Sequence, residues 1–196
     1  MNTRRDLIKK LDEKYQEVYK LRAEIVAMSK AQGEEEVDNY VFHDKDGRAV
    51  TLSDLFGRHD ELIVIHNMGK SCPYCTLWAD GLSSSTPHIL DRCGLALTTP
   101  NDVETMRSFA ENRHWQFPYY SAAENTFTYD MGFCEVREDG KKSYWPGFTT
   151  FLKKEGRMYR IACDTFGPGD FFSPIWPMMG MLHHSDKEWH PKFSYS

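Results

Sequence analysis

The chain has 196 residues, of which 40% are hydrophobic, 27% charged and 14% aromatic. This length and composition are typical of one globular domain with an appendage at most, and they exclude extended disorder. The formal net charge of −5 argues against a broad surface for nucleic acid or anionic membranes. No apolar run approaches the roughly 18 residues of a membrane-spanning helix, and the N-terminus lacks the apolar core of a secretory signal. We therefore expect a cytoplasmic protein that binds neither nucleic acid nor membrane.

The first segment, residues 3–32, is predicted to be one amphipathic helix. Its apolar side chains recur at spacings of three and four residues. Thr3 and Asp6 resemble a capping box, and Gly33 is suited to end the helix. Two interpretations stay open: the helix packs on its own domain, or it joins two copies in a homodimer. We define residues 1–36 as an N-terminal helical extension.

The middle of the chain alternates between strand and helix patterns. This alternation, followed by a hairpin, predicts an α/β layer architecture over residues 37–166. Residues 167–196 are rich in proline and aromatic residues, which predicts an irregular tail packed on the domain, with a short helix at 178–183. The expected strands are 40–42, 49–52, 62–66, 95–99, 116–120, 148–153 and 157–162, and helices are expected at 53–57, 76–82, 86–93 and 101–112, the last two capped by Thr86 and Asn101.

The strongest chemical signal is the motif Cys72-Pro73-Tyr74-Cys75, which follows a buried-strand pattern after a short loop. Proline suits the first turn of a helix, so Cys72 is expected at a helix N-terminus, where free N–H groups and the helix dipole favour a thiolate. Cys75 lies one turn later on the same helix face, within reach of a disulfide. An exposed attacking thiol beside a resolving thiol is what thiol–disulfide exchange requires.

Other interpretations of this CxxC pair stay open. A structural zinc site needs two further ligands; Cys93, Cys134 and Cys163 are isolated in the sequence, so we expect neither metal nor cofactor. A thiol peroxidase of peroxiredoxin type would carry Thr or Ser three residues before its reactive cysteine, and neither cysteine of the motif has one there. The pair could also be inert, in a binding or scaffold module without turnover.

A set of short motifs accompanies the CxxC pair in a fixed order. They are Tyr40-Val41-Phe42, Asp46-Gly47, Leu52 to Gly57, Leu62-Ile63-Val64, Cys-Pro-x-Cys, His88-Ile89-Leu90, His114 to Ser121 and Phe127 to Asp130. Between Val37 and Ile161 the chain thereby resembles a thioredoxin-like family catalogued as domain of unknown function eight hundred and ninety-nine, described as predicted dithiol-disulfide oxidoreductases. Three stretches depart from the family pattern: the loop between Asn67 and Cys72, which is shorter, Thr98-Thr99-Pro100, and the C-terminal tail.

The resemblance implies a thioredoxin-like fold, with a central mixed sheet flanked by helices, and disulfide-reductase chemistry at the CxxC pair. Thioredoxins also place a cis-proline before the third core strand, facing the CxxC. The equivalent position here is nearer Phe148 or Thr149, with Pro146 as the alternative if the loop is longer. Because glutaredoxins share the C-P-Y-C tetrapeptide, glutathione is a candidate reductant.

Further side chains are candidates for substrate binding or for tuning the thiols. Pro73 and Tyr74 lie inside the motif. His66, at the end of the preceding strand, is either a satisfied strand-end histidine or a neighbour that tunes the first thiol. Trp78 is expected in the core or beside the site. His88 either packs or caps its helix, or lies near the CxxC helix.

These patterns together predict a thiol–disulfide oxidoreductase in which Cys72 attacks and Cys75 resolves. Its partner is expected to be a disulfide-containing protein or a small thiol. The alternatives are a thioredoxin-fold scaffold without turnover, dimeric through residues 3–32, and a thiol peroxidase.

Overall fold

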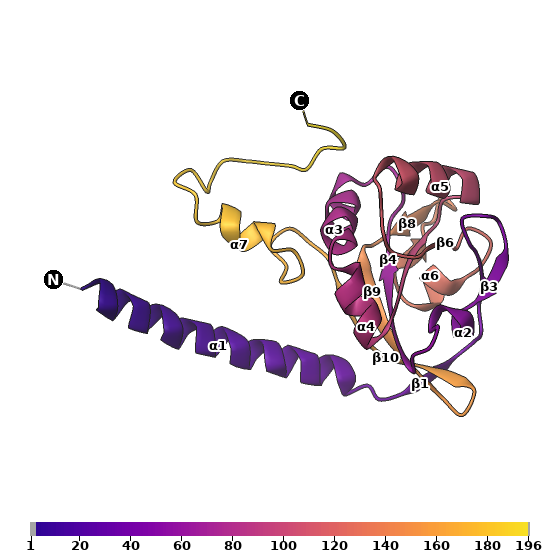
Figure 1. Cartoon of the computed structure of the whole chain (residues 1–196), viewed down its shortest axis with the longest axis horizontal. Coiled ribbons are helices and arrows are strands. Elements are labelled where there is room, and N and C mark those ends of the chain that lie inside the picture. The colour runs from indigo at the N-terminus through magenta and orange to yellow at the C-terminus, as the bar shows by residue number, and fades with distance from the viewer. Residues whose placement is uncertain (1–2, 196) are drawn as a thin grey trace.

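Eight strands form the central sheet in the order β1-β10-β9-β4-β5-β6-β2-β3, and β7 and β8 form a separate hairpin. The computed structural model (Figure 1) describes residues 3–195, so residues 1–2 of the expected extension and residue 196 of the tail lie outside the described residues. The strands are β1 (Glu35–Val37), β2 (Val41–His43), β3 (Ala49–Thr51), β4 (Glu61–His66), β5 (Gly94–Thr99), β6 (Tyr119–Ser121), β7 (Cys134–Val136), β8 (Lys142–Tyr144), β9 (Gly147–Lys154) and β10 (Arg157–Thr165). The helices are α1 (Arg4–Lys30), α2 (Leu52–Leu55), α3 (Pro73–Ser83), α4 (Thr86–Arg92), α5 (Val103–Asn112), α6 (Phe127–Asp130) and α7 (Ile175–Met179).

Strand β4 lies in the middle of the sheet and leads into the CxxC motif. It runs parallel to β5 and antiparallel to β9. Because side chains alternate across a strand, Leu62 and Val64 pack in one core with α2 and α6, whereas Ile63 and Ile65 pack in a second core with α3 and α4. Figure 1 shows these two pairs of helices on opposite sides of β4. The expected mixed sheet flanked by helices is therefore confirmed.

Several local predictions are confirmed by backbone geometry. Thr3 caps α1, with its N–H donating to Asp6 Oδ2 at 2.9 Å and the Asp6 N–H donating to Thr3 Oγ1 at 3.3 Å. Gly33 follows α1 with a φ of +81°, a left-handed conformation that favours glycine. Strands β2 and β3 pair as one antiparallel hairpin and β9 and β10 as another, from segments that the sequence predicts as strands.

Some boundaries and caps differ from the predictions. Asp102, not Asn101, caps α5, because its carboxylate accepts the Thr105 N–H at 2.8 Å. Ser85, not Thr86, precedes α4 as its N-cap. The strand predicted at 116–120 is shorter and begins later, as β6, and the tail helix predicted at 178–183 begins earlier, as α7. No peptide bond between described residues is cis, so the structure contains no cis-proline at Pro146.

Strand β1 was not predicted, because its charged sequence lacks an apolar alternation. It adds to the edge of the sheet beside β10. The end of the N-terminal extension, expected at residue 36, lies inside this strand. Ion pairs support the edge: Glu35 with Arg160, and Glu36 with Arg157 at 3.3 Å.

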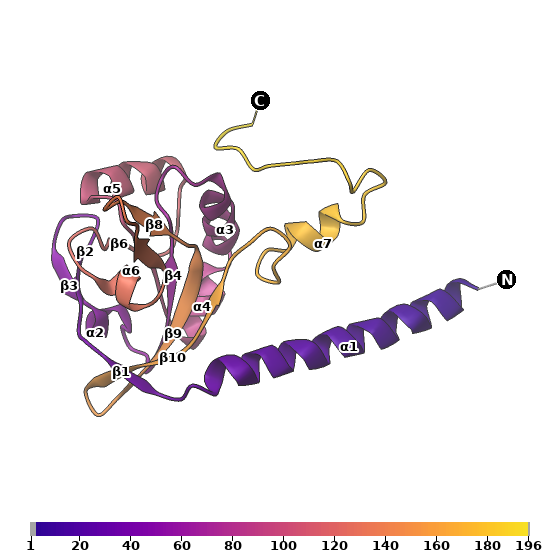
Figure 2. The ribbon, with the colours of Figure 1, turned by 180° about the vertical axis from the view of Figure 1, so that it is seen from behind.

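Two segments extend beyond the sheet and its helices. Helix α1 projects away from the rest of the chain, and the C-terminal tail leaves β10 on the same side before turning back above α3 (Figures 1 and 2). Among the described helices, none combines the length and the apolarity that crossing a bilayer requires.

Candidate functional site

The loop between β4 and α3 is held in one conformation by two asparagines. The Asn67 N–H donates to the Thr98 carbonyl at 2.9 Å, and Asn67 Oδ1 accepts the Gly69 N–H at 2.7 Å. Asn101 Oδ1 accepts the Lys70 N–H at 2.8 Å from the neighbouring strand end. Gly69 has a φ of +100°, and a Cβ there would lie 2.7 Å from Asn101 Oδ1. The loop therefore requires glycine at this position.

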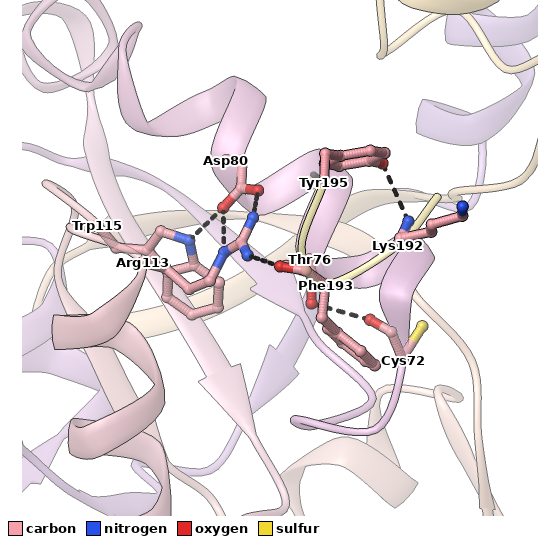
Figure 3. A network of polar contacts seen from close by, with 8 residues as sticks. All are labelled: Cys72, Thr76, Asp80, Arg113, Trp115, Lys192, Phe193 and Tyr195. Atoms are coloured by element: carbon pink, nitrogen blue, oxygen red, sulfur yellow. Dashed lines mark hydrogen bonds and ion pairs between the residues drawn. The ribbon is translucent and has the colours of Figure 1, made fainter. Parts of the chain in front are cut away.

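Cys72 is the N-cap of α3, as the sequence predicts. Its Sγ accepts the Cys75 backbone N–H at 3.1 Å, and Pro73 occupies the first turn. The Cys72 carbonyl also accepts the Thr76 hydroxyl at 3.0 Å, a contact drawn in Figure 3. Cys72 is partly exposed, whereas Cys75 is buried, and both are free thiols. The pair therefore has one accessible sulfur and one sheltered sulfur.

The two thiols have opposite pKa shifts. The pKa of Cys72 is lowered to about 7, mainly because the Cys75 thiol donates a hydrogen bond to it, helped by the N–H groups of Cys75 and Tyr74 and opposed by burial. The pKa of Cys75 is raised by that same hydrogen bond, by burial and by the neighbouring Cys72 thiolate. A larger share of Cys72 is thus a thiolate at pH 7 than the few per cent of an ordinary thiol.

The C-terminal tail is hydrogen-bonded to the CxxC motif. The Tyr74 hydroxyl lies 2.7 Å from His190 Nδ1. His190 Nε2 lies 3.0 Å from a carboxylate oxygen of Glu188 and donates to it, so in the neutral ring Nδ1 accepts the Tyr74 O–H. The Tyr74 ring also lies 6.3 Å from the Trp176 ring, and Trp176 lies 6.1 Å from Trp189. Trp176 and His190 of the tail therefore lie against Tyr74, and Trp189 lies behind Trp176.

A second anchor holds the end of the tail (Figure 3). The Asp80 carboxylate, on α3, accepts Arg113 Nε at 3.1 Å and Trp115 Nε1 at 2.9 Å, and it also pairs with Arg113 Nη2. Arg113 Nη1 donates to the carbonyl of Phe193 at 2.6 Å. Asp80 thus anchors the end of the tail through Arg113.

His66 and Thr149 lie beneath the site, on the sheet face opposite α3. His66 Nε2 lies 2.9 Å from the Thr149 hydroxyl, and the imidazole stacks on Phe133 with ring centres 4.0 Å apart. Complete burial lowers the pKa of His66 to about 3. The ring is therefore neutral near pH 7, and it places no positive charge beside Cys72.

The remaining predicted residues divide between the core and the surface. Trp78 is buried and stacks on Phe166 at 5.3 Å, and Phe148 packs against Phe166 at 5.8 Å. Both belong to the core on the α3 face of the sheet. His88 is exposed on α4, which follows the C-terminal end of α3, whereas Cys72 lies at the other end. The structure brings Pro73, Tyr74 and Trp78 together with the thiols on α3, and it places His88 away from them.

Three positioning residues were not predicted: Asn101, Arg113 and His190. The sequence predicts Asn101 as a helix cap, but its side chain instead accepts the Lys70 N–H of the loop before α3. No local pattern identifies the other two, because their partners are distant in the sequence. Within the described residues, no group of three or more His, Cys, Asp or Glu side chains is arranged to hold a metal ion.

Several solved structures of peroxiredoxins are similar to the chain. Peroxidoxin BcpB from Mycobacterium tuberculosis has a TM-score of 0.56 and 21% identity, covering 67% of this chain and 84% of that chain. Peroxiredoxin Q from Xanthomonas campestris has a TM-score of 0.52 and 16% identity, covering 64% and 79%. A peroxiredoxin-like protein from Aquifex aeolicus has a TM-score of 0.53 and 13% identity, covering 67% and 74%. At these identities the likeness concerns the fold, and the expected thioredoxin-like fold is confirmed.

No curated protein matches the sequence. A family model described as "Bacterial protein of unknown function (DUF899)" matches residues 4–185. This match extends beyond residues 37–161, within which the individual sequence motifs lie, and it includes α1 and α7. The expectation that the tail departs from the family is therefore wrong for residues up to 185. The chain belongs to the DUF899 family of bacterial proteins of unknown function.

Proposed function

We propose that the chain is a thiol–disulfide oxidoreductase acting on a disulfide in a protein or a small molecule. The observation that carries the proposal is the hydrogen bond from the Cys75 backbone N–H to Cys72 Sγ at 3.1 Å, together with the opposite pKa shifts of the two thiols. This contact stabilises a thiolate on the accessible sulfur and keeps the sheltered sulfur protonated. A nucleophile and its resolving thiol are thereby assigned to different residues of one helix turn.

The reaction transfers two electrons from the dithiol to the substrate. The Cys72 thiolate attacks one substrate sulfur, which forms a mixed disulfide and releases the other sulfur as a thiolate. That thiolate takes up a proton from the medium. Cys75 then loses its proton to the medium and attacks Cys72 Sγ, which forms the Cys72–Cys75 disulfide and releases the second substrate sulfur. A thiol reductant such as glutathione or a dithiol returns the pair to its reduced state.

Substrate contact is proposed for the side chains that adjoin Cys72. Pro73 and Tyr74 follow it directly, and the tail residues Trp176 and His190 surround Tyr74. These aromatic and polar groups would bind the chain or ring that carries the substrate disulfide. His66, Thr149 and Phe148 would act through packing, because all three lie within the sheet and its cores.

A thiol peroxidase is the second candidate, favoured by the similarity of the fold to peroxiredoxins. The Cys72 thiolate would attack a peroxide oxygen, releasing water or an alcohol and leaving a sulfenic acid. Cys75 would condense with the sulfenic acid, releasing water and forming the same disulfide. Gly69 occupies the position three residues before Cys72, where a peroxiredoxin-type site would carry Thr or Ser. We therefore rank disulfide reduction first.

The two activities and the scaffold alternative are separated by one set of assays. Wild type, Cys72→Ser, Cys75→Ser and Cys163→Ser are compared in the reduction of hydroxyethyl disulfide and of hydrogen peroxide. Cys163 is an exposed thiol outside the motif, so its variant is the matched control. We expect Cys72→Ser to lose disulfide reduction, Cys75→Ser to accumulate a mixed disulfide on Cys72, and Cys163→Ser to match wild type.

Two outcomes would overturn this ranking. Rapid peroxide consumption with slow disulfide reduction would identify a thiol peroxidase. Full activity of Cys72→Ser, or no turnover by wild type with either substrate, would reject the dithiol mechanism and favour a scaffold.

A further inference from the structure

Among the described residues, helix α1 has no packing partner along most of its length. Its 27 residues span about 40 Å, and none of them is buried. Contacts with the rest of the chain lie near its C-terminal end: the Ser29 hydroxyl donates to the Cys163 carbonyl at 2.9 Å, and the Arg22 guanidinium lies 5.0 Å from the Phe171 ring centre. Beyond these contacts the helix projects from the domain (Figures 1 and 2).

One stripe of α1 has the spacing of a coiled-coil seam. Ile8, Leu11, Tyr15, Val18 and Ile25 follow the alternating steps of three and four that define positions a and d of a heptad. The first four of these side chains are 59%, 48%, 47% and 37% exposed. Monomeric proteins rarely expose a contiguous apolar patch of more than a few hundred Å². A seam of this kind is therefore expected to be covered by another helix.

The same stripe continues into the contact between α1 and its own domain. Arg22 and Ser29 occupy the next two a positions, seven residues apart, and both contact the chain beyond α1. Ile25, at d, lines a cavity of about 300 Å³ between α1 and β10. The C-terminal part of the seam thus packs on the chain's own domain. The N-terminal part extends beyond that domain and is uncovered.

Charge favours another copy of this chain as the partner. Helix α1 carries eight basic and five acidic residues, a net +3, so the remainder of a chain with net −5 carries −8. A second copy therefore attracts α1 by its acidic body and matches it by its own seam. The like charges of the two α1 helices repel each other across the pair, so the apolar seam has to outweigh that repulsion. The acidic residues are spread from Asp6 to Glu24, which disfavours an anionic lipid surface.

The tail offers further apolar surface on the side to which α1 projects. Phe171, Met178, Met181 and Leu182 are 59%, 60%, 77% and 62% exposed. Two paired helices about 40 Å long and about 10 Å wide share a footprint of about 400 Å². A stable interface buries about 800 Å² per partner, so the tail surface supplies area that the helix pair lacks.

We infer that two copies of the chain associate about a two-fold axis, with their α1 helices paired through Ile8, Leu11, Tyr15 and Val18 and flanked by the α7 segments. Each copy then covers the seam of the other with the same residues. The inference does not depend on the proposed chemistry, because no seam residue contacts the CxxC pair.

The test measures the molar mass of the full chain by size-exclusion chromatography with light scattering. We expect wild type to elute at twice 22.9 kDa. The double variant Leu11→Glu, Val18→Glu should elute at half the wild-type mass, because it places charge in the seam. The matched control, Ala23→Glu with Ala27→Glu, adds the same charges to the opposite face of α1 and should keep the dimer. Circular dichroism and the reversible Cys72–Cys75 disulfide should be unchanged in both variants.

A monomeric wild type, or a seam variant that stays dimeric, would overturn the inference. Monomeric wild type that sediments with phosphatidylglycerol vesicles, and loses this binding in the seam variant, would instead identify a membrane surface as the partner of α1.

Discussion

The hydroxyl of Tyr74 lies 2.7 Å from Nδ1 of His190, although the two residues are 116 positions apart in the sequence. Tyr74 lies between the two cysteines of the CxxC motif, so this contact joins the C-terminal tail to the helix turn that carries both thiols. Arg113 makes the second connection, between Asp80 on α3 and the carbonyl of Phe193. The C-terminal tail is therefore joined to α3 at two points, directly at Tyr74 and through Arg113 at Asp80.

Tyr74→Phe should loosen the tail without disturbing α3. The substitution removes one hydrogen bond, a contribution of about 1 kcal/mol, and keeps the ring contacts with Trp176. We expect faster hydrogen exchange in peptides that contain His190 and unchanged exchange in peptides from α3. Tyr129→Phe removes an exposed hydroxyl elsewhere and serves as the control. Equal exchange around His190 in both variants would show that the contact does not restrain the tail.

Gly69→Ala should destabilise the loop that carries Cys72. The substitution combines a φ of +100° with a Cβ placed 2.7 Å from Asn101 Oδ1. Gly140→Ala, with a φ of +77° and no atom within 4 Å, reports the backbone strain alone. We expect about 1 kcal/mol for Gly140→Ala and about 2–3 kcal/mol for Gly69→Ala in urea unfolding. A loss at Gly69 no larger than the loss at Gly140 would contradict the close approach of Asn101.

Neutral His66 should make the fold sensitive to mild acid. Its pKa is about 3 in the folded chain against an ordinary value of 6.5, so the unfolded chain takes up the proton first as the pH falls. Stability from this group is complete above pH ~6.5 and is lost below it, by about 1.4 kcal/mol per pH unit. Urea unfolding of wild type at pH 7 and pH 5.5 should show this loss.

The matched variants for this effect are His66→Phe and His88→Phe. His66→Phe lowers stability at pH 7, because the Thr149 hydroxyl loses its partner, but it should flatten the pH dependence. His88→Phe, at an exposed position on α4, should keep the wild-type slope. An unchanged slope in His66→Phe would assign the acid sensitivity to other groups.

Local sequence patterns predict the reactive helix turn because its determinants are adjacent. The apolar run of β4, Pro73 at the first turn and the spacing of Cys72 and Cys75 all lie within fifteen residues. The alternation of side chains along β4 and β9 then decides which face of the sheet each candidate residue occupies. His66 and Thr149 face the core opposite α3, and Phe148 faces the core on the α3 side.

The tail contacts and the edge strand could not be predicted in this way. Arg113 meets Asp80 and Phe193, and Tyr74 meets His190, through pairings that no periodicity encodes. Strand β1 is charged, and it joins the sheet through ion pairs with β10 that depend on the register between distant segments.

The reactivity of Cys72 should depend on Cys75 through its pKa. In a Cys163→Ser background, the rate of Cys72 alkylation by iodoacetamide should reach half its maximum near pH 7. Cys75→Ala removes the thiol donor, so the midpoint of the alkylation rate should rise towards pH 9.0. Each unit by which the midpoint rises should slow alkylation at pH 7 by about tenfold. Cys75→Ser keeps a hydroxyl donor and should lie between the two. A midpoint that does not move in Cys75→Ala would reject this hydrogen bond as the cause.

The midpoint potential of the Cys72–Cys75 pair tests the central claim most directly. The full chain is equilibrated in dithiothreitol or glutathione buffers of graded potential, alkylated, and analysed by peptide mass spectrometry. We predict a reversible disulfide between these two cysteines, with a midpoint within the roughly −270 to −120 mV range of dithiol catalysts, while Cys93, Cys134 and Cys163 stay reduced. A CxxC pair that remains reduced in the most oxidising buffer would contradict the dithiol mechanism.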